Sequence, residues 1–286
     1  MPNPALPVTD VDKFLWRKIF DRNPLFTMAC DKLAAKKYAL TVCPELKTAE
    51  VLWTGRDPVT IPDRLLTGSV VVKANHASRW NIMIHNSEVD REAMNNLAAS
   101  WVKRTYGRAF GEWGYKNAAH CLLVEKMLLD EGRPIKTEYK FHVSGGRTAY
   151  VFVSVKQDGG EEATCYFDRD GRFSSLPDRS DSRPLVVLPA CFLRMRDIAE
   201  RLAKPFDYMR CDFYELNGDI FFSELTAYPL SGQGGSNPKL RELRNTGWDL
   251  RKSWFLTKPQ TGWRKVYARV LREWLEEDAP ATASDT

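Results

Sequence analysis

The sequence contains no long run of apolar residues. A helix that crosses a membrane needs roughly 18 to 20 such residues in succession, and no stretch of the 286-residue chain approaches this length. The first residues, MPNPALPVTDVDKF, also lack the basic and apolar regions of a signal peptide. We therefore expect a cytoplasmic protein without a membrane span.

Cysteine pairs with metal-binding or redox spacing are absent as well. The six cysteines form no Cys-x-x-Cys motif and mostly lie in apolar runs such as HCLLVE and PACFL. This pattern indicates reduced thiols in the core rather than a zinc or dithiol site. His85, His120 and His142 show no metal-ligand spacing either, and we interpret them as structural.

A dense block of basic residues is also missing. The net charge is +5 and the isoelectric point is about 8.8, but lysine and arginine are scattered along the chain. Nucleic acid is therefore not an expected partner. A nucleotide or an anionic saccharide stays compatible, because such a ligand needs only a few well-placed cations.

The residues that are present indicate a globular α+β protein. Hydrophobic residues make up 43% of the chain, with nine tryptophans and fourteen phenylalanines, which argues against disorder except in the final APATASDT. The length suits one enzyme of two or three lobes, or two small domains. Strands are predicted at 70–84 and 138–156, and helices at 31–43, 87–106 and 188–204.

The segment RCDFYELNGDIFFSELTAYP, residues 210–229, predicts a hairpin that carries two carboxylates. A two-residue Asn-Gly turn would pair Asp212 with Ser223 and place Asp212 and Glu224 on opposite faces. A three-residue loop with a bulge at Gly218 would instead pair Asp212 with Phe222 and bring all the polar residues to one face.

We expect the three-residue loop, with Arg210 opposite Glu224 and with Phe213, Phe221 and Leu225 facing the core. Two carboxylates this close resist joint ionisation unless a cation lies between them, and Mg²⁺ is the expected cation because it prefers oxygen ligands. The alternative is an ordinary solvated face of charged residues.

Two further segments carry polar residues at strand ends or inside apolar runs. VVVKA ends in Lys73, just before a loop of Asn75, His76, Ala77 and Ser78 that could contact phosphate, although a solvated strand end would look the same. LVEKM places Glu125 and Lys126 inside an apolar run, where they could meet an adenine edge or form a salt bridge.

In order, the segments DKLAAKKY, VVVKANHASRWNI, LLVEKML, EYKFHVSGGR and RCDFYELNGDIFFSELT resemble the ATP-grasp superfamily, and more narrowly its TupA-like branch of polysaccharide biosynthesis proteins. The resemblance implies the ATP-grasp fold, in which two α+β lobes clasp ATP. It divides the chain into an N-terminal helical region (1–60), a small lobe (61–126), a large lobe with the metal hairpin (127–240) and a C-terminal helical segment with a disordered tail (241–286).

The resemblance also implies a role for individual residues. Arg210 and Lys73 are expected to be catalytic, and Asp212 and Glu224 to bind Mg²⁺. The residues expected to bind ATP contact its phosphates (Lys32, Lys73, His76, Ser78), its adenine (Glu125, Lys126, Leu128) or its ribose (Glu138, near Lys140).

Two departures from the family pattern stand out. Relatives carry a glycine-rich phosphate loop of the form HGSGGN, whereas this chain has HASRWN, which makes close backbone approach to phosphate less certain. Many ATP-grasp enzymes also place asparagine two residues after the metal glutamate, and this chain has Thr226 there, so a second metal ion could be bound differently.

The resemblance implies an ATP-dependent carboxylate–amine ligase that acts through an acyl phosphate and uses ATP and Mg²⁺. The expected partners are a small carboxylate, either a uronic acid or an amino acid, and an amino-acid amine, and the oligomeric state is open, with a homodimer as one option. The alternatives are a kinase acting on a hydroxyl, a nucleotide-sugar glycosyltransferase and a non-catalytic saccharide-binding protein.

Overall fold

The computed structural model describes residues 2–157, 161–174, 186–233 and 237–277. The predicted disordered tail from Ala279 onward lies outside the described residues. Helices and sheets are mixed, as the α+β prediction requires. Among the described residues, no helix combines the length and the apolarity needed to cross a bilayer.

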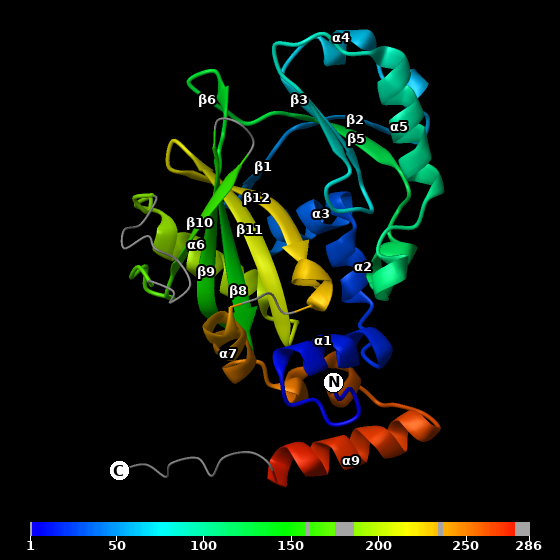
Figure 1. The fold of residues 1–286 in the computed structure, drawn as a ribbon, viewed down its shortest axis with the longest axis vertical. Helices are drawn as coiled ribbons and strands as arrows, with labels where there is room; N and C mark the ends of the chain where they lie inside the picture. The colour runs from blue at the N-terminus through cyan, green and yellow to red at the C-terminus, as the bar shows by residue number, and fades with distance from the viewer. Residues whose placement is uncertain (1, 158–160, 175–185, 234–236, 278–286) are drawn as a thin grey trace.

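Two sheets dominate the fold (Figure 1), and each belongs to a separate lobe. The large sheet has the strand order β1-β12-β11-β8-β9-β10, the small sheet has the order β2-β5-β3-β4, and a short ribbon pairs β6 with β7. The strands are β1 (Lys47–Thr48), β2 (Val51–Gly55), β3 (Val70–Ala74), β4 (Asn81–Ile84), β5 (Leu122–Lys126), β6 (Leu129–Asp130), β7 (Arg133–Pro134), β8 (Thr137–Ser144), β9 (Arg147–Lys156), β10 (Glu162–Phe167), β11 (Tyr208–Leu216) and β12 (Asp219–Thr226).

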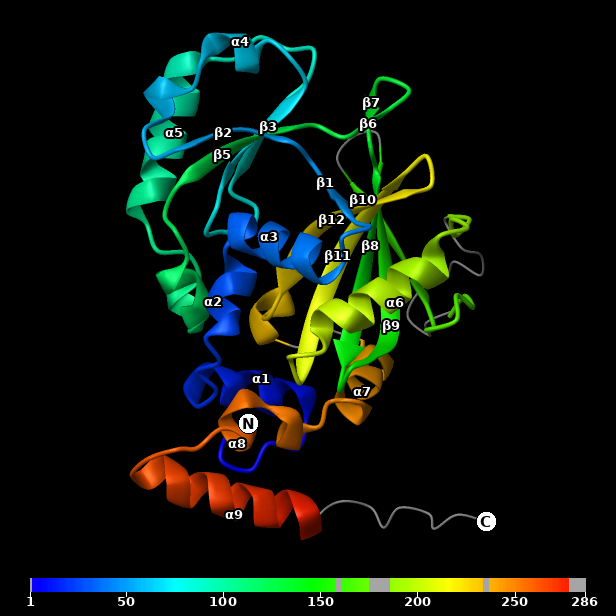
Figure 2. The same cartoon turned by 180° about the vertical axis from the view of Figure 1, so that it is seen from behind.

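The helices surround these sheets. The α-helices are α1 (Asp10–Ile19), α2 (Leu25–Cys30), α3 (Lys32–Val42), α4 (Asp63–Leu66), α5 (Arg91–Lys103), α6 (Phe192–Ala203), α7 (Pro238–Thr246), α8 (Trp254–Thr257) and α9 (Trp263–Glu277). The 3-10 turns are η1 (Pro58–Thr60), η2 (Arg108–Phe110), η3 (Trp113–Asn117), η4 (Pro229–Gly232) and η5 (Leu250–Lys252). Seen from both sides, α3 lies between the two sheets and α6 covers one face of the large sheet (Figure 2).

Local sequence explains where most elements begin. Asp31 caps α3 by accepting the backbone N–H of Ala34. The helix predicted from 87 starts four residues later, because Asp90 rather than Ser87 accepts the free N–H of Ala93. The ambiguous run CLLVEKMLL forms β5, the buried strand between β2 and β3.

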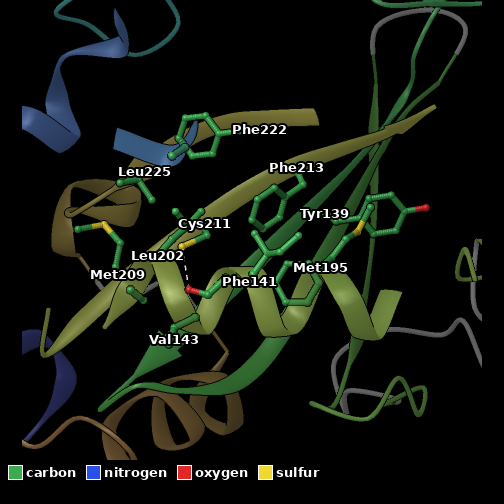
Figure 3. Packing of buried hydrophobic residues seen from close by; sticks show 14 of the residues in the cluster. Tyr139, Phe141, Val143, Met195, Leu202, Met209, Cys211, Phe213, Phe222 and Leu225 are labelled. Atoms are coloured by element: carbon green, nitrogen blue, oxygen red, sulfur yellow. Dashed lines mark hydrogen bonds between the residues drawn. The ribbon is translucent and has the colours of Figure 1, made fainter. Parts of the chain in front are cut away.

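Apolar side chains between α6 and the large sheet form the main core (Figure 3). Phe141, Cys211 and Phe213 are fully buried and point from β8 and β11 toward α6, where they meet Met195 and Leu202. Because successive strand residues point to opposite faces, the neighbours Arg210 and Asp212 point to the other side. The functional face of this sheet is therefore the one turned toward the small lobe.

The predicted three-residue loop of the hairpin is wrong. Leu216 pairs directly with Asp219, and Asn217 and Gly218 form a two-residue turn with φ of 54° and 83°. Positive φ at both positions matches the strand twist and suits Asn-Gly. The turn alone would have separated the two acids, yet they share a face.

A bulge at Ser223 explains why Asp212 and Glu224 share a face despite the two-residue turn. Phe213 pairs with Phe222 and Asp212 pairs with Glu224, so Ser223 is an extra residue on β12. Asp212 therefore faces Glu224 rather than Phe222, and Arg210 faces Thr226 rather than Glu224.

The same bulge corrects the predicted core face of β12. Before the bulge the even positions Ile220 and Phe222 are buried, whereas Phe221 is only half-buried. After the bulge the odd position Leu225 is buried. Phe221 therefore lies on the face opposite to the predicted one.

Strand β2 pairs with β5 in the small sheet, although it precedes residue 61. The lobe boundaries given from the sequence stay a prediction.

Candidate nucleotide and metal site

A row of charged residues crosses three neighbouring strands of the large sheet. The strand register places Lys140 of β8 opposite Asp212 of β11, and Asp212 opposite Glu224 of β12. Arg210 lies two residues from Asp212 on the same face. The two arms of the β11-β12 hairpin and the distant strand β8 thus present their polar side chains at one place.

Arg210 joins the two acids. Its Nε and one terminal nitrogen donate to the two oxygens of Asp212 at 2.7 and 2.6 Å, and the same terminal nitrogen donates to Oε1 of Glu224 at 2.9 Å. The hydroxyl of Thr226 donates to that Glu224 oxygen at 3.0 Å. One cation therefore serves two carboxylates, which leaves the group with a surplus negative charge.

The pKa values of Asp212 and Glu224 shift in opposite directions. Asp212 is fully buried, and this desolvation raises its pKa, although Arg210 and Lys140 oppose the rise. Burial also opposes ionisation of Glu224, but Arg210, Lys32 and the Thr226 hydroxyl together lower its pKa. Because Arg210 bonds both oxygens of Asp212 at short distance, we take the carboxylate to be ionised while that pair is formed.

The donor set fits a magnesium ion. Asp212, Glu224 and Thr226 present only oxygen atoms, the ligands that Mg²⁺ prefers. Across the described residues, no three His, Cys, Asp or Glu side chains lie close enough together to form a metal cluster of their own. The chain would thus supply two carboxylates and leave the other coordination positions to water and phosphate, which is the usual way in which proteins hold Mg²⁺.

Glu138 and Lys140 extend the row along β8. The Lys140 ammonium binds Glu138 and donates to the Ser154 hydroxyl at 3.0 Å. The hydroxyl of the bulge residue Ser223 donates to the other Glu138 oxygen at 3.0 Å. The structure thus brings both predicted residues to the edge of the acid pair.

The small sheet carries a second charged group with the opposite balance. Glu125 of β5 is 2% exposed and forms ion pairs with Lys36 of α3 at 2.8 Å and with Lys73 of β3 at 2.5 Å. Burial would raise the pKa of Glu125, but the two lysines more than offset it and lower the pKa. Two cations serve one carboxylate, so this group has a surplus positive charge.

Lys32 lies between the two groups. Its ammonium donates to the backbone carbonyl of Ala77 in the loop after β3. Burial lowers the pKa of Lys32, with the charge of Lys73 adding to this effect and the charge of Glu224 opposing it. The side chain is therefore within electrostatic reach of both lobes.

Asn75 fixes α3 against this loop. Its backbone carbonyl accepts from the N–H of Lys32 at 3.2 Å, and its side-chain oxygen accepts from the N–H of Leu33 at 2.9 Å. Its side-chain nitrogen donates to Ala119 at 2.9 Å. The first turn of α3 is thus tied to the small lobe, which explains how Lys32 and Lys73 come together.

The loop HASRWN adopts a tight conformation although it contains no glycine. The N–H of Ala74 donates to the carbonyl of Trp80, and Arg79 takes a left-handed φ of 62° that glycine would adopt more easily. Trp80 packs against Trp101 and Tyr106. Aromatic packing therefore holds a loop whose backbone strain is not relieved by glycine.

Four predicted ligand residues are not part of the charged cluster. His76 is fully buried, stacks on His120 at 3.9 Å and donates from Nε2 to the carbonyls of Trp101 and Arg104. Ser78 bonds Tyr106. Lys126 and Leu128 lie where the chain leaves the small sheet for the ribbon β6-β7. Their contacts with ATP stay a prediction.

Sequence reasoning missed Lys36, Asn75 and Glu112. Lys36 could have been found, because it lies one helical turn after Lys32 and thus on the same side of α3. Asn75 was noted only as a phosphate contact, and nothing local in the sequence reveals that its side chain joins two segments.

Glu112 is a buried acid between α1, the η2-η3 segment and η4. It is 4% exposed, and its Oε2 atom has no hydrogen-bond partner. Desolvation raises its pKa to about 7, although Lys18 and the Ser231 hydroxyl oppose the rise. Ser231 follows the β11-β12 hairpin in a left-handed turn with φ of 51°, so Glu112 supports the backbone just beyond the acid pair.

The sequence matches a known protein family. The profile described as TupA-like ATPgrasp matches residues 12–243. No curated protein matches the sequence.

Similar solved structures include the D-alanine–D-alanine ligase of Bacillus anthracis complexed with ATP (13% identity, TM-score 0.43, 70% of this chain and 53% of that chain). The D-alanine–D-alanine ligase of Helicobacter pylori is 13% identical, with a TM-score of 0.46, and the match covers 84% of this chain and 67% of that chain. A third similar structure is the ATP-grasp ligase PsnB complexed with a phosphomimetic variant of its minimal precursor, Mg and ADP. It is 12% identical, with a TM-score of 0.44, and the match covers 88% of this chain and 60% of that chain. The chain thus spans about half the length of the Bacillus ligase, and similarity at this level assigns no activity to it.

Proposed function

Because the chain belongs to the TupA-like ATP-grasp family, we propose that it is an ATP-dependent ligase that joins a carboxylate to an amine through an acyl phosphate. The carboxylate would be a uronic acid or an amino-acid carboxyl group, and the amine would belong to an amino acid. The reaction would serve the biosynthesis of a polysaccharide or a natural product.

The observation that carries this proposal is the opposite charge surplus on the two lobes. Glu125 with its two lysines offers spare positive charge to phosphates, and Arg210 with its two acids offers spare negative charge to a cation. Magnesium–ATP carries both kinds of charge. A solvated polar face would not need Asp212 fully buried.

Each residue then has a defined task. Lys32 and Lys73 would bind the phosphates next to the loop after β3, and Glu138 would accept hydrogen bonds from the ribose. Asp212 and Glu224 would hold Mg²⁺, which supplies charge neutralisation at the β- and γ-phosphates. Arg210, released from part of its contact with the acids, would stabilise the charge on the transferred phosphoryl group.

The chemistry would proceed in two steps. An oxygen of the substrate carboxylate attacks the γ-phosphorus, the bond to the β-phosphate oxygen breaks, and ADP leaves with the electron pair. The amine nitrogen then attacks the acyl carbon and loses a proton, and inorganic phosphate leaves. The chain contributes positioning and electrostatic stabilisation rather than a covalent intermediate.

An ADP-release assay with mass detection tests this function. The purified protein is incubated with Mg-ATP and pairs drawn from a panel of amino acids and uronic acids. We expect ADP release that requires both a carboxylate and an amine, and a product whose mass equals their sum minus water. A stable phosphorylated product that forms without any amine would instead establish a kinase and overturn the ligase.

A further inference from the structure

The last helix, α9, carries an apolar stripe that the described chain leaves largely exposed, although Phe20 contacts the ring of Trp263 at its start. One side of α9 packs into the body of the protein through Ala268 and Leu271, which are 2% and 0% exposed. Another side presents Trp263, Val266 and Val270, which are 62%, 55% and 46% exposed. Spacings of three and four residues place these three side chains in one line along the helix.

The helix lies where a partner can reach it. Both views place α9 at the end of the molecule opposite the small lobe (Figures 1 and 2). It also lies outside residues 12–243, the part that the family profile matches. A partner on α9 would therefore lie away from the charged groups of the two lobes.

Charge along α9 is divided in a way that identifies the partner. The basic residues Arg264, Lys265, Arg269 and Arg272 occupy the first two thirds of the helix, and the acidic residues Glu273, Glu276 and Glu277 occupy the last third. Lys265, Arg269, Glu273 and Glu276 form an exposed line beside the apolar stripe. Two such helices attract each other when antiparallel and repel each other when parallel.

We propose that α9 is a homodimer contact in which it pairs antiparallel with α9 of a second copy, around a twofold axis at Val270. The two Val270 side chains meet at the axis, as the self-complementary contact of a twofold dimer requires. Val266 then lies level with Trp274 of the second copy, which extends the apolar contact along the pair.

The same geometry pairs the charges. Each Arg269 lies beside Glu273 of the second copy, about two residues from level, and each Lys265 lies beside Glu276 of the second copy, about one residue from level. The two Arg269 side chains are the like charges nearest the axis, and each has an acid of the other copy beside it. A single helix pair buries less surface than the roughly 1,200 to 2,000 Å² of a stable interface, so the dimer should form only at high protein concentration.

Sedimentation equilibrium of the full chain over a concentration series tests the dimer. We expect a monomer–dimer equilibrium for the wild type and at least tenfold weaker association for Val270→Glu, which places two acids at the axis. Val59→Glu is the matched control, because Val59 is 66% exposed on the small lobe, and it should associate as the wild type does. Thermal unfolding confirms that both variants fold.

Charge variants identify the pairing. An acidic variant, Lys265→Glu with Arg269→Glu, and a basic variant, Glu273→Lys with Glu276→Lys, should each stay monomeric alone and form a heterodimer when mixed. A monomeric wild type at every concentration would overturn the proposal, as would association that neither Val270→Glu nor the charge variants change. Monomeric protein that binds phosphatidylglycerol vesicles through α9 would also overturn it and would make a lipid surface the occupant.

Discussion

The two charged groups, one on each lobe, are built from the same kinds of charge in opposite proportions. On the small lobe one buried carboxylate, Glu125, bonds two lysines. On the large lobe one guanidinium, Arg210, bonds two carboxylates. The first group pairs its single acid with two cations and keeps a surplus positive charge, whereas the second shares one cation between two acids. The surplus sign, rather than the number of ion pairs, distinguishes the group suited to phosphate from the group suited to a metal.

The largest expected effect comes from removing one acid of the large-lobe group. Asp212→Asn should lower ADP release on the order of 10³-fold, because the metal loses a charged ligand and Arg210 loses its bidentate partner. Unfolding free energy should change by less than about 1 kcal/mol, since a neutral Arg210–Glu224 pair is left. Asp219→Asn, at an exposed position of the same hairpin, is the control for both measurements. An active Asp212→Asn enzyme would remove Asp212 from the site.

The same type of change in the small-lobe group should act on stability instead. Glu125→Gln leaves Lys36 and Lys73 close together without their shared acid. We expect the unfolding free energy to fall by roughly 3 kcal/mol, as for a buried charge that loses its partner. Chemical denaturation of this variant beside Asp212→Asn measures the contrast directly. Equal stability losses in the two variants would show that the surplus sign of each group is irrelevant to folding.

Glu112 extends the comparison to a buried acid that bonds no cation. Its folded pKa of about 7 lies above the ordinary glutamate value, so the folded state holds a proton that the unfolded state has already released. Stability contributed by the protonated acid is present at low pH and falls by up to roughly 3 kcal/mol as the pH rises from about 4.5 to about 7. Glu112→Gln should remove this fall.

The measurement is the difference in denaturation free energy between wild type and Glu112→Gln at pH 5 and pH 8. Taking the difference removes the contribution of Asp21, whose pKa is also raised, to about 8, by burial. If both proteins lose the same stability over this range, Glu112 is already ionised in the folded state.

The smallest expected effect comes from removing Lys73, one of the two cations that pair with Glu125. Lys73→Ala should weaken ATP binding by roughly 2 kcal/mol, the size of a charge-assisted hydrogen bond, and should leave adenosine binding unchanged. Calorimetric titration with both ligands measures this, with Lys37→Ala on the exposed side of α3 as the control. Equal losses for ATP and adenosine would mean that Lys73 acts through the fold.

Many residues of the two charged groups could be predicted from the sequence, but little of their geometry could. The α+β class, the hairpin and the shared face of Asp212 and Glu224 were predicted, but with Asp212 opposite Phe222 and Arg210 opposite Glu224. That register was wrong, because Asn217 and Gly218 form the two-residue turn and the extra residue is Ser223, which pairs Asp212 with Glu224. Strand alternation could have located it, since Phe222 and Leu225 are both apolar but three residues apart.

Contacts between segments distant in sequence could not be predicted in this way. Lys36 reaches Glu125 only because Asn75 ties α3 to the loop after β3. The place of His76 in that loop predicts a phosphate contact, but only packing between elements brings its ring to the backbone carbonyls of Trp101 and Arg104 at the end of α5. Local pattern places a residue on an element, and packing between elements decides what the side chain meets.

The bulge at Ser223 also determines how the chain can gain or lose residues. Without Ser223 the remaining residues of β12 alternate regularly, so Glu224 still faces Asp212 and Leu225 still faces the core. A deletion or insertion between the turn and Ser223 would turn either Phe222, or Glu224 and Leu225 together, to the wrong face. When relatives are aligned to this chain, a gap of one residue in the strand therefore belongs at Ser223, and the position of Glu224 should be counted from Pro229 rather than from the turn.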